Sequence, residues 1–265
     1  MVAFSIKQTG VPLGAALAGF LVPALTLGFG WRSAALTVAV LCVITAFAAQ
    51  SLRAALDADR APARPLALGN FMQPIRVILA HPPLARSVLA AMTYAGIQLC
   101  CFTFLVAYLT DSVGLTLIAA GAAMSFANGA GIVGRIIWGA VADRTRAPGI
   151  VLGALGVTMM LASIGIAAFT NAWPYSLVLA VCTLFGVSAV GWNGVQISET
   201  ARLAPPGMAA VVAGGSTFLT FAGVLAYTGL FALLHDVTES WRVPFVVFCL
   251  PAGVMGVMHF IYARR

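Results

Sequence analysis

The chain has 265 residues, of which 62% are hydrophobic and only 8% are charged. An ordinary soluble domain carries about 25% charged residues, and a soluble fold leaves a large part of its chain exposed to water. The composition therefore excludes a soluble domain and indicates a protein immersed in a lipid bilayer. The net charge of +7 does not indicate nucleic-acid binding, because the basic residues lie between apolar runs and are not interleaved with aromatic residues.

Eight apolar runs are long enough to cross a membrane as helices, which takes about 20 residues. Closed β-barrels also span membranes, but their strands alternate polar and apolar residues, and these runs do not alternate. We therefore predict an all-α integral membrane protein with eight transmembrane helices, at residues 8–29, 33–52, 87–109, 114–138, 149–170, 174–196, 208–234 and 243–263.

One connection is much longer than the others. Residues 53–86 form a polar stretch that contains several arginines and the prolines Pro62, Pro65, Pro74, Pro82 and Pro83. Such a composition is typical of a boundary between domains. We predict an inter-domain loop here, part of which, residues 66–80, forms a helix on the membrane surface.

The basic residues orient the predicted helices. If the N-terminus and residues 53–86 lie in the cytoplasm, 12 of the 14 basic residues fall on the cytoplasmic side, and only Arg32 and Arg242 fall outside. Such an excess of Lys and Arg marks the cytoplasmic side of a membrane protein. We predict a multi-pass protein of the inner (plasma) membrane with both termini in the cytoplasm.

A weak internal repeat relates the two ends of the chain. Gly30-Trp31-Arg32 precedes the second predicted helix and Ser240-Trp241-Arg242 precedes the eighth, at an offset of 210, and Gly19 meets Gly229 at the same offset. Repeats are common in transporters. The offset implies a unit of six helices, so that helices three to eight form one unit and helices one and two end another. We expect the four missing helices to precede Met1 in the same polypeptide.

The most specific motif lies at the end of the fourth predicted helix. Gly139, Asp143 and Arg144 have the spacing G-x-x-x-D-R, with Gly134 and Arg135 upstream. This segment resembles the loop signature of the major facilitator superfamily, in the copy that joins the eighth and ninth of twelve helices. The resemblance implies a charged network that latches the two halves of a transporter on the cytoplasmic side. Residues 145–148, Thr-Arg-Ala-Pro, depart from the expected Gly and basic run.

Two further segments carry the same resemblance. Residues 10–14, Gly-Val-Pro-Leu-Gly, followed by Gly19, resemble a degenerate Gly/Pro-rich motif of the fifth helix, and residues 191–202 are similar to bacterial members. The resemblance implies that the chain corresponds to helices 5–12 of the twelve-helix fold. Residues 1–52 would end the N-terminal half, 53–86 would be the cytoplasmic loop between the halves, and 87–265 the complete C-terminal half. The implied function is secondary transport of a small solute by alternating access.

Polar residues inside membrane helices are costly and tend to face cavities or partner helices. They are concentrated in the predicted helices that, by the resemblance, line the central path, whereas the second, fifth and eighth helices are almost without them. The alternative for each residue is a hydrogen bond between helices. The candidates for the substrate path are Tyr94, Gln98, Asn128, Trp192, Asn193, Thr217 and Thr220.

Glycines and a proline mark the first predicted helix, at Gly10, Pro12, Gly14 and Gly19. Such residues allow a helix to bend at a gate. They also allow neighbouring helices to pack closely, and the sequence does not separate these two roles.

Two other functions were weighed against transport. A membrane enzyme needs clustered catalytic side chains at one depth, but His81, His235 and His259 are far apart and no cluster of metal ligands or nucleophiles exists, so we expect no enzyme activity, metal or cofactor. A truncated remnant without transport activity is the other alternative. No acidic residue lies in the middle of a predicted helix, which disfavours a cationic substrate. The expected partners are the lipid bilayer and an unidentified small solute.

Overall fold

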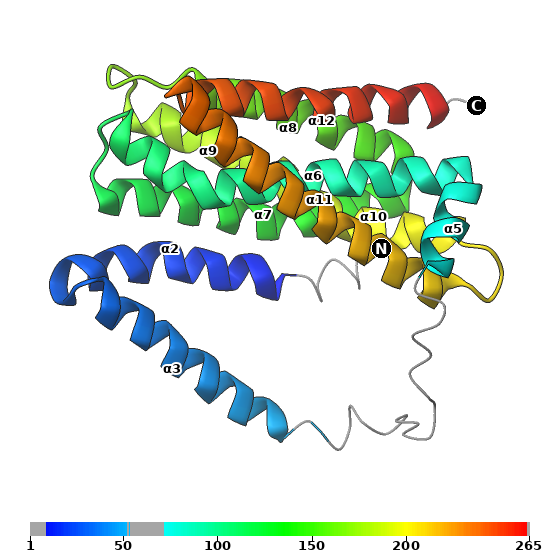
Figure 1. The fold of residues 1–265 in the computed structure, drawn as a ribbon, viewed down its shortest axis with the longest axis horizontal. Helices are drawn as coiled ribbons and strands as arrows, with labels where there is room; N and C mark the ends of the chain where they lie inside the picture. The colour runs from blue at the N-terminus through cyan, green and yellow to red at the C-terminus, as the bar shows by residue number, and fades with distance from the viewer. Residues whose placement is uncertain (1–8, 52, 54–71, 264–265) are drawn as a thin grey trace.

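The computed structural model describes residues 9–51, 53 and 72–263, and these residues form helices without any strand (Figure 1). Eight helical spans among them are long and apolar enough to cross a membrane, as predicted. The helices are α2 Gly10–Phe29, α3 Trp31–Gln50, α5 Gln73–Ala80, α6 Pro82–Asp111, α7 Leu117–Thr145, α8 Pro148–Ala167, α9 Tyr175–Ala189, α10 Trp192–Leu203, α11 Ala209–Thr238 and α12 Arg242–Ala263. Helices α9 and α10 follow one another as a single span.

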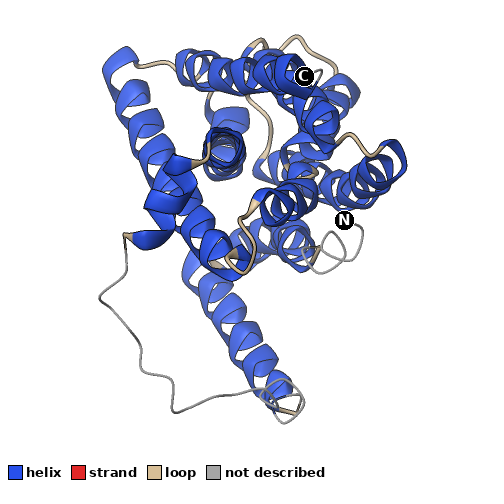
Figure 2. Ribbon diagram, turned by 90° about the vertical axis from the view of Figure 1, so that its right-hand side faces the viewer, coloured by secondary structure: helices blue, strands red, loops and turns tan. Residues whose placement is uncertain are grey.

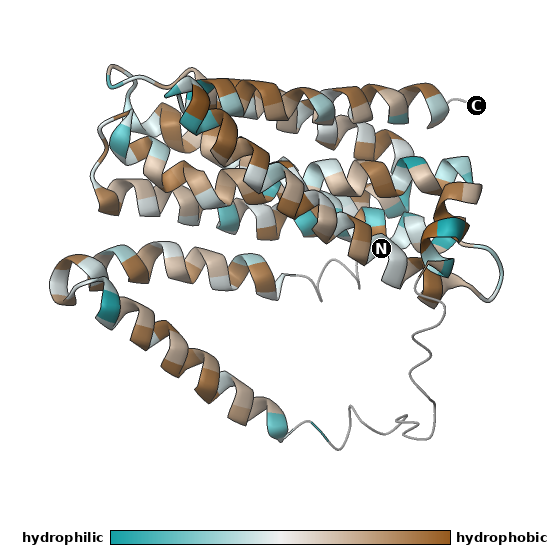
Figure 3. Ribbon diagram, viewed as in Figure 1, coloured by the Kyte–Doolittle hydropathy of each residue, from teal (hydrophilic) through white to brown (hydrophobic). Residues whose placement is uncertain are grey.

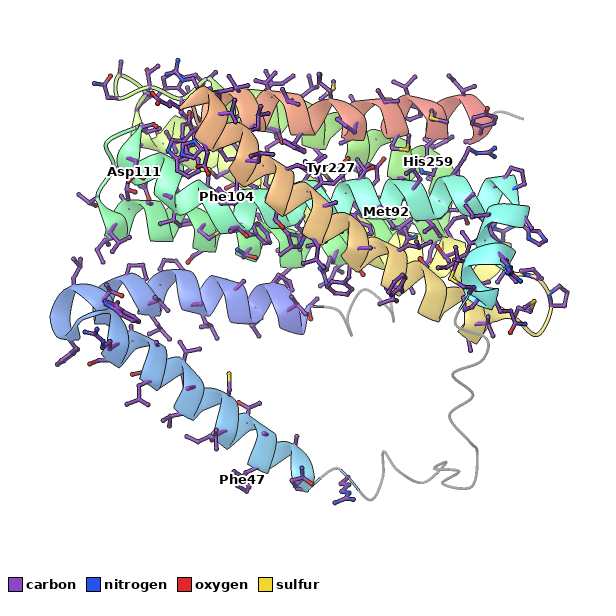
Figure 4. The ribbon with its side chains drawn as sticks, viewed as in Figure 1. Phe47, Met92, Phe104, Asp111, Tyr227 and His259 are labelled. Atoms are coloured by element: carbon purple, nitrogen blue, oxygen red, sulfur yellow. The ribbon has the colours of Figure 1, made fainter. Side chains whose placement is uncertain are left out.

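The surface of the bundle is as apolar as its interior. Helix α3 is hydrophobic between its two polar ends (Figure 3), and Phe47 near its C-terminal end is 74% exposed and points away from the other helices (Figure 4). Large apolar side chains are also exposed on the outer helices, such as Leu161 on α8 and Leu225 on α11. Exposure of this apolar surface to water would be unfavourable, whereas lipid tails solvate it.

The main body consists of α6 to α12, which run side by side around a common core (Figure 2). Close backbone approach at small residues holds the pairs together. Gly186 of α9 lies directly against the backbone of Ala127 on α7, and a Cβ atom on Gly153 of α8 would lie 3.0 Å from the carbonyl oxygen of Gly256 on α12. Any larger residue at these positions would separate the helices.

Helix α3 diverges from this body, whereas α2 lies alongside it (Figure 1). Helix α2 packs against α7, and α3 packs against α2. Ala34 is the buried residue of α3, and the remainder of α3 is exposed along the part that the structure describes. The link between the first two helices and the body is therefore the contact of α2 with α7.

The predicted inter-domain loop at 53–86 is partly helical. Residues 54–71 lie outside the described residues, but α5 and the first turn of α6 fall within the predicted loop. Ile78 of α5 is buried beside Val212 of α11, so this segment packs against the six-helix body. Helix α6 begins at Pro82, earlier than predicted, because Pro82 and Pro83 occupy the first helical positions, where proline is favoured. Of the predicted surface helix 66–80, residues 73–80 are helical.

The G-x-x-x-D-R segment is helical as well. Helix α7 continues through Asp143 and Arg144 to Thr145, so that the predicted loop residues form its last turn. The chain then turns at Arg146, which has a left-handed backbone with φ 53°, and Pro148 begins α8. The turn is therefore shorter than the sequence indicated, since helix continues beyond the apolar run.

Candidate functional site

The span formed by α9 and α10 is interrupted in the interior of the bundle, at Val190 and Gly191. A break in a helix leaves a backbone carbonyl group without its usual partner. The Nε atom of Arg135 on α7 donates a hydrogen bond to the carbonyl oxygen of Val190 over 2.8 Å. Arg135 is only 3% exposed. A buried guanidinium group thus satisfies the break and ties it to α7.

Glycines on α7 bring this helix against the break. A Cβ atom on Gly131 would collide with the side chain of Val190, and one on Gly134 would lie 2.6 Å from the carbonyl oxygen of Val187. On the other side, Gly191 leaves room for the ring of Trp138. The upstream half of the G-x-x-x-D-R segment is therefore a packing surface that fits the interrupted span.

The other motif residues lie further along α7. Gly139 is buried, whereas Asp143 and Arg144 are exposed in the last turn. Eight residues separate Arg135 from Asp143, which is about 12 Å along a helix. The five motif residues are thus on one helix, but they divide into a buried group at the break and a charged group at the end of the bundle.

Helices α2 and α7 meet at residues without bulky side chains. The hydroxyl group of Ser125 donates to the carbonyl oxygen of Ala16 over 2.8 Å, and a Cβ atom on Gly19 would collide with that hydroxyl group and lie 2.9 Å from the carbonyl oxygen of Gly121. By contrast, a Cβ atom on Gly10 or Gly14 would meet open space. Gly19 therefore serves close packing.

Pro12 is buried within α2, which runs as one helix from Gly10 to Phe29. Four residues were predicted to make this helix flexible. Pro12 is buried and Gly19 packs against α7, whereas Gly10 and Gly14 are exposed. No break marks the helix in this conformation.

A cavity of about 450 Å³ lies beside this contact, between α2, α6 and α7. Its walls are small or apolar, with Asn128 and Thr26 as the polar contributors. The amide nitrogen of Asn128 donates to the carbonyl oxygen of Met124 over 3.0 Å, but its Oδ1 atom is buried and has no hydrogen-bond partner among the described residues. A buried acceptor without a partner costs about 1–3 kcal/mol. Asn128 itself is fully buried, with 0% of its surface exposed, so this unpartnered acceptor lies within the wall of the cavity.

Three other predicted path residues form bonds between helices. The hydroxyl group of Tyr94 donates to the carbonyl oxygen of Leu152 on α8 over 3.0 Å. The indole nitrogen of Trp192 donates to Oε1 of Gln98 over 3.1 Å, and the rings of Tyr94 and Trp192 contact edge to face with centroids 6.0 Å apart. These bonds join α6 to α8 and α10. In this conformation the three residues therefore make hydrogen bonds between helices, which was the alternative to a place on the substrate path.

The remaining path candidates are separated from this cluster. Thr217 is exposed and Thr220 half-buried on α11, and Asn193 is half-buried directly after the helix break. None of the three lines the cavity that contains Asn128. The structure therefore brings Asn128 to the cavity and Tyr94, Gln98 and Trp192 to a neighbouring bonded group, while the two threonines lie on another helix.

One buried polar network lies outside the residues that were predicted for the substrate path. The amide nitrogen of Gln196 donates to the hydroxyl oxygen of Thr200 over 2.7 Å, and that oxygen lies 3.3 Å from the hydroxyl oxygen of Ser87 on α6. One turn further on, Glu199 pairs with Arg202 through two bonds of 2.7 Å. The spacing of four between Gln196 and Thr200, one helical turn, was the available signal.

The fold and the buried polar groups define a helical multi-pass membrane protein. The sequence matches the Major Facilitator Superfamily over residues 1–228, and the chain belongs to this family of transporters. The structure is similar to that of a variant of the E. coli fucose:proton symporter FucP, with a TM-score of 0.67 and 17% sequence identity, over 89% of this chain and 58% of that one. The chain thus spans a little over half the length of that structure. No curated protein matches the sequence significantly.

Proposed function

We propose that the chain supplies helices 5–12 of a secondary transporter that moves a small solute by alternating access. Helices α2 and α3 would belong to the N-terminal half, and α6 to α12 would form the C-terminal half. Four further helices, in the same polypeptide, would complete the first half and cover the exposed faces of α2 and α3. The family membership, and a body of six helical spans against which α2 packs chiefly through α7, support this division.

The cavity between α2, α6 and α7 is the observation that carries this proposal. It lies where the two halves would meet, and the unpartnered Oδ1 atom of Asn128 gives it a polar anchor. Sites for small ligands are typically apolar cavities with a few placed polar groups. Asn128 would accept a hydrogen bond from a hydroxyl or amide group of the solute.

The described lining of the cavity carries no ionised side chain. Transfer of a charged solute into such surroundings would be costly without a countercharge. This wall of the path therefore fits an uncharged solute with at least one hydrogen-bond donor. A coupling ion, if one is used, would be bound by groups elsewhere in the transporter.

The interrupted span would act as the moving element. The interruption at Val190 and Gly191, where Arg135 donates to the carbonyl oxygen of Val190, would let the two parts of the span change their angle, as do discontinuous helices in other transporters. At the end of α7, Asp143 and Arg144 would latch the halves together when the path is closed on that side. The basic residues concentrated at this end support a cytoplasmic location, as the positive-inside rule requires.

Uptake into proteoliposomes tests the proposal. A panel of labelled neutral sugars, amides and polyols would be offered to the chain within a polypeptide that supplies the first four helices. The variant Asn128→Ala should lower the uptake rate roughly 5- to 30-fold, since one hydrogen bond is worth on the order of 1–2 kcal/mol. Asn171→Ala is the matched control, because Asn171 is exposed in the turn between α8 and α9. Equal uptake by both variants would contradict the role of Asn128.

A further inference from the structure

A second hollow, of about 390 Å³, lies at the end of the bundle where α6 and α8 begin and α12 ends. It is separate from the cavity at Asn128 and shares no lining residue with it. Its charged and aromatic lining comes from four different parts of the chain: Arg86, Arg146, Glu199, Arg202, His259 and Tyr262. Figure 4 shows His259 at this end of the molecule and Asp111 at the opposite end.

The hollow has a surplus of positive charge. Its described lining contains three guanidinium groups and one carboxylate, and both oxygens of Glu199 are engaged by Arg202 at 2.7 Å. Arg86 and Arg146 therefore face the hollow without a carboxylate of its lining left to balance them. The guanidinium group of Arg86 lies over the ring of Tyr262, 3.8 Å from its centroid, which holds it at the rim.

The backbone adds to this field. Arg146 turns the chain in a left-handed conformation. After Ala147, Pro148 and Gly149 begin α8 and line the hollow. The N-terminus of a helix carries about half a positive charge, which favours a phosphate group. Proline has no N–H group, and the N–H groups of Ile150 and Val151 donate to the carbonyl oxygen of Ala147, so α8 contributes its dipole and the N–H group of Gly149. Guanidinium groups bind phosphate through paired hydrogen bonds.

An exposed apolar face of α12 lies beside the hollow. Val254, Val257 and Ile261 of α12 are exposed and belong to the same helix turns as the lining residues Met258 and Tyr262. An acyl chain can lie along this apolar face while its headgroup occupies the hollow. Tyrosine and arginine at a helix end are typical of the level of lipid headgroups.

We propose that this hollow binds the phosphate of an anionic phospholipid headgroup. Basic pockets between membrane helices bind such headgroups. The positive-inside rule accounts for many arginines on the cytoplasmic side of the membrane. It does not require that arginines from α6, from the α7–α8 turn and from α10 line the same hollow. The site bridges α6, α8, α10 and α12 of the six-helix half, so a bound lipid would brace that half as a unit. The proposal does not depend on transport activity.

Native mass spectrometry of the purified chain tests it. The chain would be titrated with phosphatidylglycerol and, separately, with phosphatidylcholine, and we expect one phosphatidylglycerol to be retained in preference. The double variant Arg86→Gln/Arg146→Asn should weaken that binding roughly tenfold or more, since each basic group near the membrane surface is worth about fivefold. Asparagine suits the left-handed backbone at Arg146. Arg76→Gln on α5 is the matched control, because Arg76 is exposed and does not line the hollow.

The single variant Arg146→Asn guards against misfolding, because Arg146 is exposed on a turn and its replacement leaves the helix packing intact. A loss of several-fold by this variant, with Arg76→Gln unchanged, supports the site. Equal retention of both lipids by the unmodified chain, or equal phosphatidylglycerol binding by all variants, overturns it. Displacement of the lipid by millimolar inorganic phosphate also overturns the lipid assignment, in favour of a soluble anion.

Discussion

Arg135 and Val190 are 55 positions apart in the sequence, yet the side chain of one donates a hydrogen bond to the carbonyl oxygen of the other over 2.8 Å. The bond occurs where the span of α9 and α10 is interrupted, and the glycines at 131 and 134 allow α7 to approach it. A charged group buried in a membrane protein is costly unless it has a partner of this kind. The bond therefore joins the carbonyl group at the interruption to a residue of the predicted motif.

Replacement of Arg135 should destabilise the protein. Arg135→Gln shortens the donor and leaves the carbonyl oxygen of Val190 without its bond, which should lower the free energy of unfolding by about 1.5–3 kcal/mol. Arg144→Gln on the same helix is exposed and should change it by less than about 0.5 kcal/mol. Unfolding by SDS, followed by circular dichroism, measures both. Equal stability of the two variants would remove the capping role of Arg135.

The contact between α2 and α7 can be tested at a glycine. Gly19→Val should force the two helices apart, because a Cβ atom there collides with the hydroxyl group of Ser125, and overpacking of this kind costs about 1–3 kcal/mol. Gly14→Val introduces the same side chain into open space and serves as the control. Thermal unfolding in detergent should show a lower midpoint for Gly19→Val alone. A similar decrease in both variants would point to helix propensity instead of packing.

Transport should depend on the charge at the end of α7. Asp143→Asn should reduce uptake by up to about fivefold while membrane insertion stays normal, because the amide keeps the size of the side chain and removes the charge that the proposed latch uses. Asp111→Asn changes the same group at the opposite end of the bundle, where Asp111 is exposed, and should leave uptake unchanged. Normal uptake by Asp143→Asn would exclude the latch.

The orientation in the membrane is open to a chemical test. In a background without the native cysteines, Asp236→Cys should react with an impermeant maleimide added to intact cells, and Arg76→Cys should react only after the membrane is opened. Both positions are exposed, so accessibility depends on the side of the membrane. The reverse pattern would invert the proposed topology.

The eight spans could be predicted because length and hydropathy alone determine whether a helix can cross a bilayer. Helix ends were less predictable: α6 begins at Pro82 and α7 continues to Thr145, since a helix can extend past its apolar run into polar surroundings. Asn128 could be selected as a polar residue within an apolar run. Ser125 could not, because a serine in a membrane helix usually bonds within its own helix, whereas this hydroxyl group also reaches Ala16 of α2.

Long-range contacts explain the rest of the difference. The sequence marked Tyr94, Gln98 and Trp192 as polar at membrane depth and allowed for bonds between helices, but it did not indicate the partners, which are Leu152 for Tyr94 and Gln98 for Trp192. It likewise assigned Arg86 and Arg146 to one side of the membrane without indicating that they line the same hollow. Hydropathy reports the depth of a residue, whereas its partner depends on how the helices pack.

The central proposal is that the cavity between α2, α6 and α7 belongs to a path that opens alternately to the two sides of the membrane. Met124 lines this cavity, and Phe126, two residues further along α7, is exposed on its surface. Each would be replaced by cysteine in the background without native cysteines, in the complete polypeptide. Vesicles of both orientations would then be treated with an impermeant maleimide. We predict labelling of Met124→Cys from either side and none of Phe126→Cys. Failure of Met124→Cys to react from one or both sides would contradict alternating access through this cavity.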